Sequence, residues 1–290
     1  MLDVIFVILH YNTIDETINC VKSIKELKDN KKIKIIIVDN KSPNNTGIEL
    51  EEMYKDDELV DVLLNDNNSG FSRGNNYGYT YMKEKYDTKF AIFCNNDIIF
   101  NDREIIEKIK NIYKKEKFYV LGPDVYNPRC DIHQSPIPIV NSKLWRVNIT
   151  IFLNKLALTF FGFYWFLVTH LSRNNKNKTN EENKIQEVKL ERKNNVPMMG
   201  ACLIFSNDFV KEREKVFEPE TFMYYEEYML HNWCVKNNKN TIFEPDITVY
   251  HNDGMATNSI KDTEKNKCRF RMEKILESAK IYRKRLKGKI

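Results

Sequence analysis

The sequence has few cysteines and few glycines, and neither residue type forms a recognised metal or nucleotide motif. The six cysteines, none of them in a C-x-x-C pair, stand at positions 20, 94, 130, 202, 234 and 268. This spacing argues against a zinc site and a disulfide framework, and it is typical of a reducing cytosol. The nine glycines form neither G-x-G-x-x-G nor G-x-x-x-x-G-K-[ST]. Neither a dinucleotide fingerprint nor a P-loop is therefore indicated.

The chain also lacks a long apolar run and a recognisable leader. The uncharged stretch 156–169 has 14 residues, fewer than the roughly 20 that cross a bilayer. At the N-terminus, Asp3 stands where a signal peptide would carry positive charge, and no small-residue cleavage site follows. We interpret MLDVIFVILHY as a first strand and not as a targeting segment.

Positive charge is concentrated at the C-terminus. The whole chain carries a net +5, but residues 261–290 hold 12 Lys/Arg and 4 Asp/Glu, a net of +8, so the other 260 residues carry −3. The basic character therefore belongs to the tail, which is helical by composition. No aromatic-interleaved patch or motif supports nucleic-acid binding by this tail.

Apolar runs of strand length alternate with helical patterns in the first 115 residues. The runs at residues 4–9 and 32–40 are typical of buried strands, a weaker strand pattern covers 60–65, and a fourth covers 89–97. Thr13 and Glu16 form a capping-box pattern before the first helical segment. The alternation predicts an α/β fold, with a mostly parallel sheet flanked by helices.

Two of these strands are followed by an acidic residue. Asp39 comes directly after Ile35–Val38, and Asp97 follows Asn95 and Asn96 in the stretch FCNNDIIF. In open α/β sheets, ligands bind beyond the carboxyl ends of the strands, where a carboxylate can ligate a divalent cation or accept hydrogen bonds from a base or ribose. Such residues are also ordinary turn formers. Two of them in neighbouring strand positions favour a binding site.

Three further segments carry residues capable of chemistry. NNSGFSRGNNYG (67–78) places glycines every four residues at the expected start of a helix, where backbone amides favour phosphate; tight packing of that helix on the sheet is the alternative. Glu226 and Glu227 begin another expected helix, either as a general base or as acids favoured by the helix dipole. His251 ends the strand pattern TIFEPDITVYH, where it could be structural or face a metal or diphosphate.

Taken in order, these motifs resemble those of the GT-A family 2 glycosyltransferases. The resemblance covers about residues 3–252 and is closest to the rhamnosyltransferase-like branch that builds bacterial surface polysaccharides. The ordered set is far more specific than any one of its members. The matching segments are VDN (38–40), NNSGFSRGNNYG (67–78), NND (95–97), GACLIF (200–205), FMYYEE (222–227) and EPDITVYH (244–251).

The resemblance implies a role for each matching residue. Asp97 would be the metal-binding acid of the DxD motif, with Asn95 in place of its first Asp, and would hold Mg²⁺ or Mn²⁺ together with His251. Glu227 would match the acid that usually serves as catalytic base, and because the motif is Glu-Glu here, Glu226 is a second candidate. The residues expected to border the nucleotide sugar are Tyr11, Asn12, Asp39, Asn68, Gly70, Arg73, Gly74, Asn75, Asn96 and Asp97.

The implied activity is an inverting, metal-dependent glycosyl transfer. The donor would be dTDP-rhamnose or a UDP-sugar, and the acceptor a saccharide, expected to be lipid-linked, in capsule, O-antigen or cell-wall polysaccharide synthesis. Two other classes stay open. One is a sugar-phosphate nucleotidyltransferase. Such an enzyme would have a Gly-rich loop directly after the first strand, where this chain has HYNTIDET, which contains no glycine. The other is a non-catalytic membrane-associated binding protein.

We expect a GT-A catalytic domain over residues 1–260 and a basic helical tail over 261–290. The domain would contain an insert at 136–195, with an apolar helical part at 144–171 and a polar, mobile linker at 172–195. A second copy of the chain, forming a homodimer, is one partner that this insert could contact.

The apolar part of the insert favours a helix or helical hairpin in the membrane interface, with Trp145, Tyr164 and Trp165 as amphipathic anchors. A buried helix and a dimer contact are the alternatives. The polybasic tail would be drawn to anionic lipid. We therefore predict a cytoplasmic protein, peripheral on the inner face of the bacterial plasma membrane.

Overall fold

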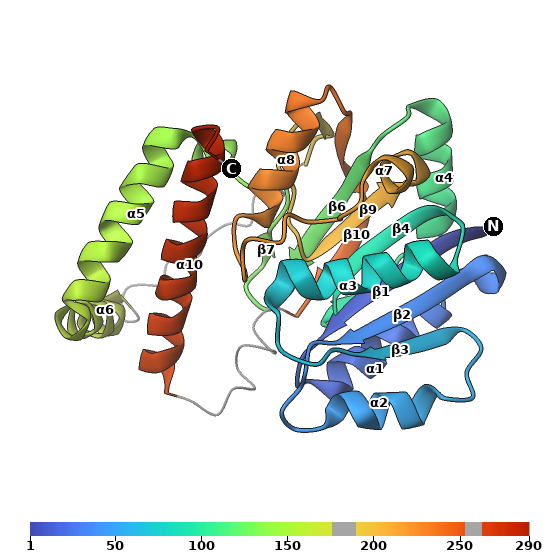
Figure 1. Cartoon of the computed structure of the whole chain (residues 1–290), viewed down its shortest axis with the longest axis horizontal. Coiled ribbons are helices and arrows are strands. Elements are labelled where there is room, and N and C mark those ends of the chain that lie inside the picture. Colours follow the sequence, from blue (N-terminus) through green and yellow to red (C-terminus); the bar gives the residue numbers. More distant parts are fainter. Residues whose placement is uncertain (176–189, 253–262, 290) are drawn as a thin grey trace.

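The structure is a computed structural model that describes residues 1–175, 190–252 and 263–289. Within these residues, a ten-stranded sheet lies between two layers of helices, and three further helices stand at one end of it (Figure 1). The strands are β1 (Leu2–His10), β2 (Ile33–Asp39), β3 (Val60–Leu64), β4 (Thr88–Asn95), β5 (Ile98–Ile99), β6 (Val120–Asn127), β7 (Ile132–His133), β8 (Lys193–Asn194), β9 (Cys202–Ser206) and β10 (Thr241–His251).

The α-helices lie before, between and after these strands. They are α1 (Ile14–Lys25), α2 (Thr46–Tyr54), α3 (Gly70–Lys85), α4 (Ile105–Lys115), α5 (Leu144–Thr159), α6 (Phe161–Asn175), α7 (Asn207–Glu212), α8 (Glu226–Lys236) and α10 (Glu264–Leu286). Two short 3₁₀ turns are η1 (Asn30–Lys32) and η2 (Ile139–Ser142).

The strand order puts six parallel carboxyl ends at one edge of the sheet. The order is β3-β2-β1-β4-β9-β6-β10-β5, with β7 beside β6 and β8 beside β10. The first four strands pair in parallel, and β9 is antiparallel to both β4 and β6. Because two antiparallel pairings restore the direction, β6 and its parallel partner β10 run the same way as β1.

The central strands are buried on both faces because alternate side chains enter two different cores. Phe6 and Ile8 pack toward α1, α2 and α4, whereas Ile5 and Val7 pack toward α3, α7 and α8. This period-two alternation between two covered faces explains why the strand sequences are continuously apolar. The predicted α/β class with a mostly parallel sheet is confirmed.

The capping box expected at α1 is absent. Thr13 occupies the N-cap position, but its side chain makes no capping hydrogen bond. Its hydroxyl accepts instead from Asn96 Nδ2, at 2.8 Å. A tertiary contact therefore replaces the local one.

The third group of helices has its own core. This core joins α5, α10 and the beginning of α8, and it contains Val147, Ile151, Tyr225, Met229, Leu276, Ala279 and Tyr282. The division of the chain at residue 260 stays a prediction, but α10 is packed against the insert and not detached from it. Of the expected linker at 172–195, residues 176–189 lie outside the described residues.

In the part of the chain that the structure describes, no single helix is both long and apolar enough to cross a membrane. The helix α5 and residues Phe161–His170 of α6 reach that length only together, with a bend of 98° between them.

Candidate functional site

The parallel strands bring the predicted site residues to one edge of the sheet. His10, which ends β1, pairs with Asp39, which ends β2, and Leu9 pairs with Asn95, which ends β4. The two-residue strand β5 begins just after Asp97 and pairs with the last residues of β10, so that His251 stands opposite Ile98. The segments that were widely spaced in the sequence therefore meet at the carboxyl ends of the strands.

Asp39 is buried and is held by the loop that follows β2. The hydroxyl and the backbone N–H of Ser42 donate to Asp39 Oδ1 at 2.5 and 3.1 Å. Gly47 backs the carboxylate, because a Cβ at this position would lie 2.2 Å from Asp39 Oδ2. Half-buried Tyr11 and Asn12 continue from β1, and Asn12 N–H donates to Ser42 Oγ at 2.9 Å. Since a carboxylate can accept about four hydrogen bonds, Asp39 keeps capacity for a ligand.

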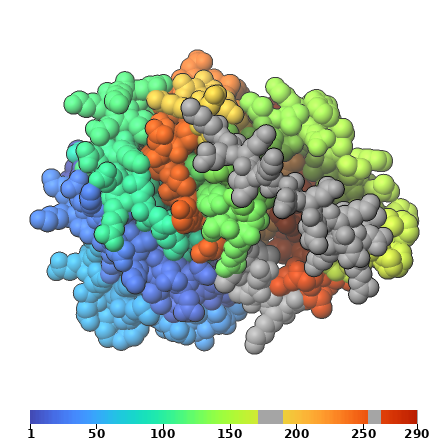
Figure 2. Space-filling model, turned by 180° about the vertical axis from the view of Figure 1, so that it is seen from behind, coloured from blue at the N-terminus to red at the C-terminus, as the bar shows by residue number. Residues whose placement is uncertain are grey.

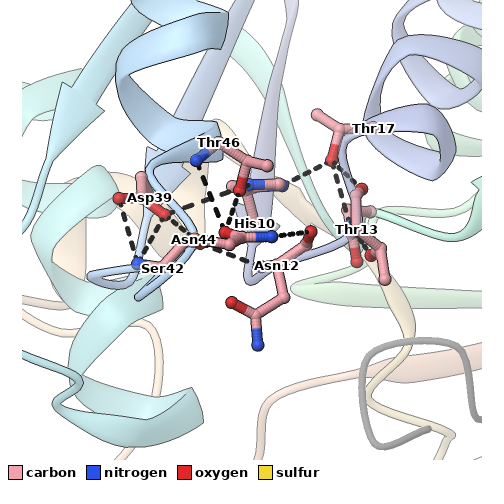
Figure 3. Close-up of polar contacts among 9 residues, drawn as sticks. His10, Asn12, Thr13, Thr17, Asp39, Ser42, Asn44 and Thr46 are labelled. Atoms are coloured by element: carbon pink, nitrogen blue, oxygen red, sulfur yellow. Dashed lines mark hydrogen bonds and ion pairs between the residues drawn. The ribbon is translucent and has the colours of Figure 1, made fainter. Parts of the chain in front are cut away.

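His10 is the centre of a polar network that joins the ends of β1 and β2 to the starts of α1 and α2 (Figure 3). Its Nδ1 lies 2.7 Å from Thr17 Oγ1, and its Nε2 lies 2.9 Å from Thr46 Oγ1 and 4.0 Å from Asp39 Oδ1. Burial lowers the pKa of His10 to about 4, although Asp39 opposes this shift. A neutral imidazole therefore bridges the two loops at neutral pH.

The amide and the carboxylate of the turn after β4 have different partners. Asn96 Nδ2 donates to Thr13 O at 3.1 Å and to Thr17 Oγ1 at 3.0 Å, which ties the turn to α1. Asp97 is buried, and within the described residues its Oδ1 has no hydrogen-bond donor. This oxygen lies 3.3 Å from His251 Nε2.

The Asp97–His251 pair is suited to a hard divalent cation. Mg²⁺ is usually held by one or two protein carboxylates and completes its coordination with water and substrate phosphates. No group of three or more His, Cys, Asp or Glu that could hold a metal occurs among the residues described here. A cation at Asp97 would therefore need oxygens from a bound diphosphate.

The beginning of α3 is joined to the segment that precedes α8. Phe71 N–H donates to Phe222 O at 2.6 Å. Gly70 has φ +82°, a backbone conformation that other residues rarely adopt. A Cβ there would also lie 2.3 Å from the same carbonyl oxygen, so both the backbone conformation and the available space require glycine. Asn40 Nδ2 donates to Asn68 Oδ1 at 3.0 Å and to Gly70 O at 3.2 Å. The end of β2 is thus connected through α3 to the region of residue 222.

Three other predicted residues of α3 have structural partners. Gly74 lets the helix approach the end of β1, because a Cβ there would lie 2.7 Å from Leu9 Cδ1. Exposed Arg73 donates from Nε to Pro219 O at 2.9 Å. Buried Asn75 donates to a carbonyl oxygen one turn earlier in the same helix, at 3.0 Å. The side chains of Arg73 and Asn75 are therefore engaged with the backbone.

The two acids at the start of α8 have different surroundings. Glu226 is 2% exposed, with its Oε1 accepting from Thr221 Oγ1 at 3.3 Å and from Ser72 Oγ at 3.4 Å. Half-buried Glu227 accepts from Gly200 N–H at 3.3 Å. Burial raises the pKa of both carboxyls, and together with the neighbouring Glu227 it raises that of Glu226 to about 8. This shift favours the protonated form of Glu226 at neutral pH.

The sequence did not point to the residues that hold this edge together, which are His10, Thr17, Ser42, Thr46 and Gly47. One signal was present: His10 is a polar residue that directly follows the apolar run Val4–Leu9. A buried polar residue requires partners, but the partners come from α1 and α2 and could not be paired without the fold.

Comparison with known proteins decides the family. The sequence profile described as "Glycosyl transferase family 2" matches residues 5–173, which is more than half of the chain. The chain belongs to glycosyl transferase family 2. A comparison with curated protein sequences finds no match.

Solved glycosyltransferase structures share the fold at low sequence identity. Residues 1–349 of Staphylococcus aureus TarS align with a TM-score of 0.54 and 13% identity, over 98% of this chain and 72% of TarS 1–349. The mannosyltransferase PcManGT from Pyrobaculum calidifontis, solved in complex with GDP-Man and Mn²⁺, aligns with a TM-score of 0.55 and 10% identity, over 96% of this chain and 73% of that one. TarS 1–349 in complex with UDP aligns with a TM-score of 0.55 and 13% identity, over 95% and 70% of the two chains.

These likenesses confirm the GT-A fold that the sequence motifs predicted. Family membership and fold together support a glycosyltransferase over the nucleotidyltransferase and the binding protein that the sequence left open. The rhamnosyltransferase-like branch and the individual site residues stay predictions.

Proposed function

We propose that this family 2 enzyme transfers a sugar, with inversion, from a UDP- or dTDP-sugar to a saccharide acceptor. The observation that carries the proposal is the continuous set of contacts along the carboxyl edge of the sheet. Asp39 connects through His10 and Thr17 to Asn96 beside Asp97, and through the adjacent Asn40 and α3 to the segment that leads into Glu226 and Glu227. The proposed base-binding, metal-binding and proton-accepting groups thus surround one edge.

Each proposed group has a chemical task for which its surroundings are suitable. Asp39 would accept the imide N–H of uracil or thymine, or a ribose hydroxyl. Asp97 and His251 would hold Mg²⁺ or Mn²⁺, which when bound neutralises charge on the nucleoside diphosphate as it leaves. Tyr11, Asn12, Asn68 and the start of α3 would border the donor.

Of the two acids, Glu227 is the proposed base. Glu226 is buried and carries a proton at neutral pH, so it cannot accept another from the acceptor hydroxyl. Glu227 is more exposed, and the raised pKa of its carboxyl brings it closer to the operating pH, where a general base is most effective. It would take the hydroxyl proton as the acceptor oxygen attacks the anomeric carbon from the face opposite the leaving diphosphate.

Activity assays with a panel of UDP- and dTDP-sugars and Mn²⁺ test this proposal. We expect Asp97→Asn to lower the transfer and donor-hydrolysis rates at least about 100-fold without loss of folding, since the amide keeps the shape but removes the charge. Asp56→Asn, at an exposed position, is the matched control and should retain activity. Full activity in Asp97→Asn would remove the metal role from this residue.

We also propose that the acceptor is lipid-linked and that the enzyme contacts the membrane through α5 and α6. Four of the six exposed large apolar residues of α5 fall on one helical stripe, at Trp145, Ile149, Phe152 and Leu156, and exposed Phe160 follows directly after the helix. Phe163, Phe166 and Leu167 extend the exposed apolar surface onto α6. Exposed apolar side chains gathered on one helical stripe mark an interaction site.

The charge of this region suits anionic lipid. The sequence from Ile132 to Asn175 contains no Asp or Glu, whereas Lys143, Arg146 and Lys155 are exposed on or beside α5. Positive charge next to an aromatic and aliphatic stripe is typical of helices that lie in the membrane interface. We propose on this basis a position on the inner face of the plasma membrane and a role in surface polysaccharide synthesis.

Vesicle co-flotation tests the membrane contact. Phe152→Glu with Phe163→Glu should weaken binding to phosphatidylglycerol vesicles at least about tenfold, because two aromatic side chains no longer enter the interface. The matched control is Ile48→Glu with Met53→Glu, two exposed apolar residues of α2 at the opposite end of the molecule (Figure 2). Equal binding by both double variants would refute the contact. Loss of a dimer in place of vesicle binding would assign the stripe to a second copy of the chain.

A further inference from the structure

The structure assigns Gln134 the role of a positioning residue for His251. We infer that the amide oxygen of Gln134 fixes the ring orientation and the tautomer of His251, so that the Nε2 lone pair faces Asp97. The inference rests on the proposed metal site and adds a residue to it that no motif indicated.

The contact that carries the inference is short and well supported. Gln134 Oε1 lies 2.6 Å from His251 Nδ1. Gln134 directly follows β7, whose residues Ile132 and His133 pair with β6, and its own N–H donates to Val125 O at 2.8 Å. A hairpin therefore fixes the backbone of Gln134, and its side chain reaches across to the end of β10.

The chemistry of the amide sets the tautomer of the imidazole. An amide oxygen can only accept, so Nδ1 must donate to it. In a neutral imidazole, Nε2 then presents a lone pair. That nitrogen lies 3.3 Å from Asp97 Oδ1, which is also an acceptor. A divalent cation bound beside Asp97 Oδ1 would therefore meet this lone pair of His251 as well.

This arrangement is the one by which proteins orient a metal-binding histidine. The ring nitrogen that does not face the metal usually donates to a carboxylate, a carbonyl or water, and loss of that partner typically weakens metal binding about 10- to 100-fold. Here the partner comes from a hairpin that is remote in sequence from both proposed ligands. Gln134 would thus couple the β6–β7 hairpin to the metal site.

Two variants of Gln134 distinguish the effect of its acceptor oxygen from the effect of its side-chain volume. Gln134→Glu keeps an oxygen that can accept from Nδ1, whereas Gln134→Leu keeps a similar volume without one. Ile132→Ala, an exposed position on β7, is the matched control. Folding of each variant is checked by thermal unfolding.

The first measurement is Mn²⁺ affinity, by electron paramagnetic resonance titration in saturating UDP. We expect Gln134→Leu to weaken binding about 10- to 100-fold, and Gln134→Glu and Ile132→Ala to bind within a few-fold of wild type. The second measurement is the tautomer of His251 in the metal-free protein, by ¹⁵N nuclear magnetic resonance. With five histidines in the chain, its signal is identified by its loss in His251→Ala. The Nδ1–H form should dominate in wild type and be lost in Gln134→Leu.

The outcomes distinguish this inference from the function on which it rests. Unchanged Mn²⁺ affinity and tautomer in Gln134→Leu would overturn the role of Gln134 while leaving the metal site intact, provided that Asp97→Asn and His251→Ala lose binding. Unchanged affinity in those two variants would overturn the metal site and the role of Gln134 with it.

Discussion

Glu226→Gln should make the protein more stable at neutral pH, and the gain should grow with pH. The unfolded carboxyl loses its proton near its ordinary pKa of 4.5, whereas burial keeps the folded carboxyl protonated up to about pH 8. Between these values the folded state binds more protons than the unfolded state, so stability falls as pH rises. Glutamine has nearly the same shape and no proton to lose, which removes this dependence.

The size of the effect follows from the width of the pH interval. Each unit within it costs about 1.4 kcal/mol, so raising the pH from about 5.5 to about 7.5 should cost the wild type about 3 kcal/mol that Glu226→Gln does not lose. Urea denaturation of both proteins at the two pH values gives the change in unfolding free energy with pH for each protein, and the two changes are then compared. Glu51→Gln, on the exposed side of α2, serves as the control for a carboxylate in water.

The reasoning would be refuted if the unfolding free energies of wild type and Glu226→Gln differed by the same amount at both pH values. This result would show that Glu226 is ionised in the folded protein or has the same pKa in both states. The variant also bears on mechanism, because an amide replaces the protonated acid. Glu226→Gln should therefore keep transferase activity, while Glu227→Gln should lose it.

Three more predictions concern the edge of the sheet. Gly47→Ala should raise the KM for a UDP-sugar and cost about 1–3 kcal/mol of stability, because its methyl group would displace Asp39. The control is Gly162→Ala, where an added Cβ has no atom within 4 Å, so the KM and the stability should not change. On acidification the wild type should lose stability, because the pKa of His10 is about 4 in the folded state and 6.5 in the unfolded state. The loss should be about 3 kcal/mol between these two pH values. His10→Gln should remove this loss, as measured by urea denaturation at both pH values. Asn96→Asp should lower the melting temperature, since a carboxylate cannot donate to the α1 groups that now accept from the amide.

The strands could be predicted because their sequences carry one dominant signal. A strand covered on both faces must be apolar at every position. The segments Val4–Leu9 and Ile35–Val38 have this pattern, which indicates a buried strand. The direction of a short strand has no such signal. CLIFS in β9 would be equally apolar in either direction, so its antiparallel insertion between β4 and β6 is fixed by tertiary connection and not by local sequence.

The candidate site divides in the same way. The place of Asp39 and Asp97 at the carboxyl ends of β2 and β4 was predictable, because a charged residue directly after a buried apolar run marks the end of a strand. The burial of Glu226 was not, since one of the two hydroxyls that donate to it belongs to Ser72, more than 150 residues away. Gln134 was equally hidden, because its partner His251 lies 117 residues later in the chain. Spatial pairing, and not residue type, decides these roles.

The stretch FCNNDIIF shows why one acid stands among two amides. Asn96 Nδ2 donates to the carbonyl oxygen of Thr13 and to the hydroxyl of Thr17, which an amide can do and an ionised carboxylate cannot. A second carboxylate there would meet acceptors in a buried place and would repel Asp97 as well. The amide fixes the turn against α1, and the turn places Asp97 Oδ1 3.3 Å from His251 Nε2. Among the residues that the structure describes, this oxygen has no hydrogen-bond donor. In the proposed metal site, Asn96 would fix the position of the turn, and a bound cation would balance the charge of Asp97.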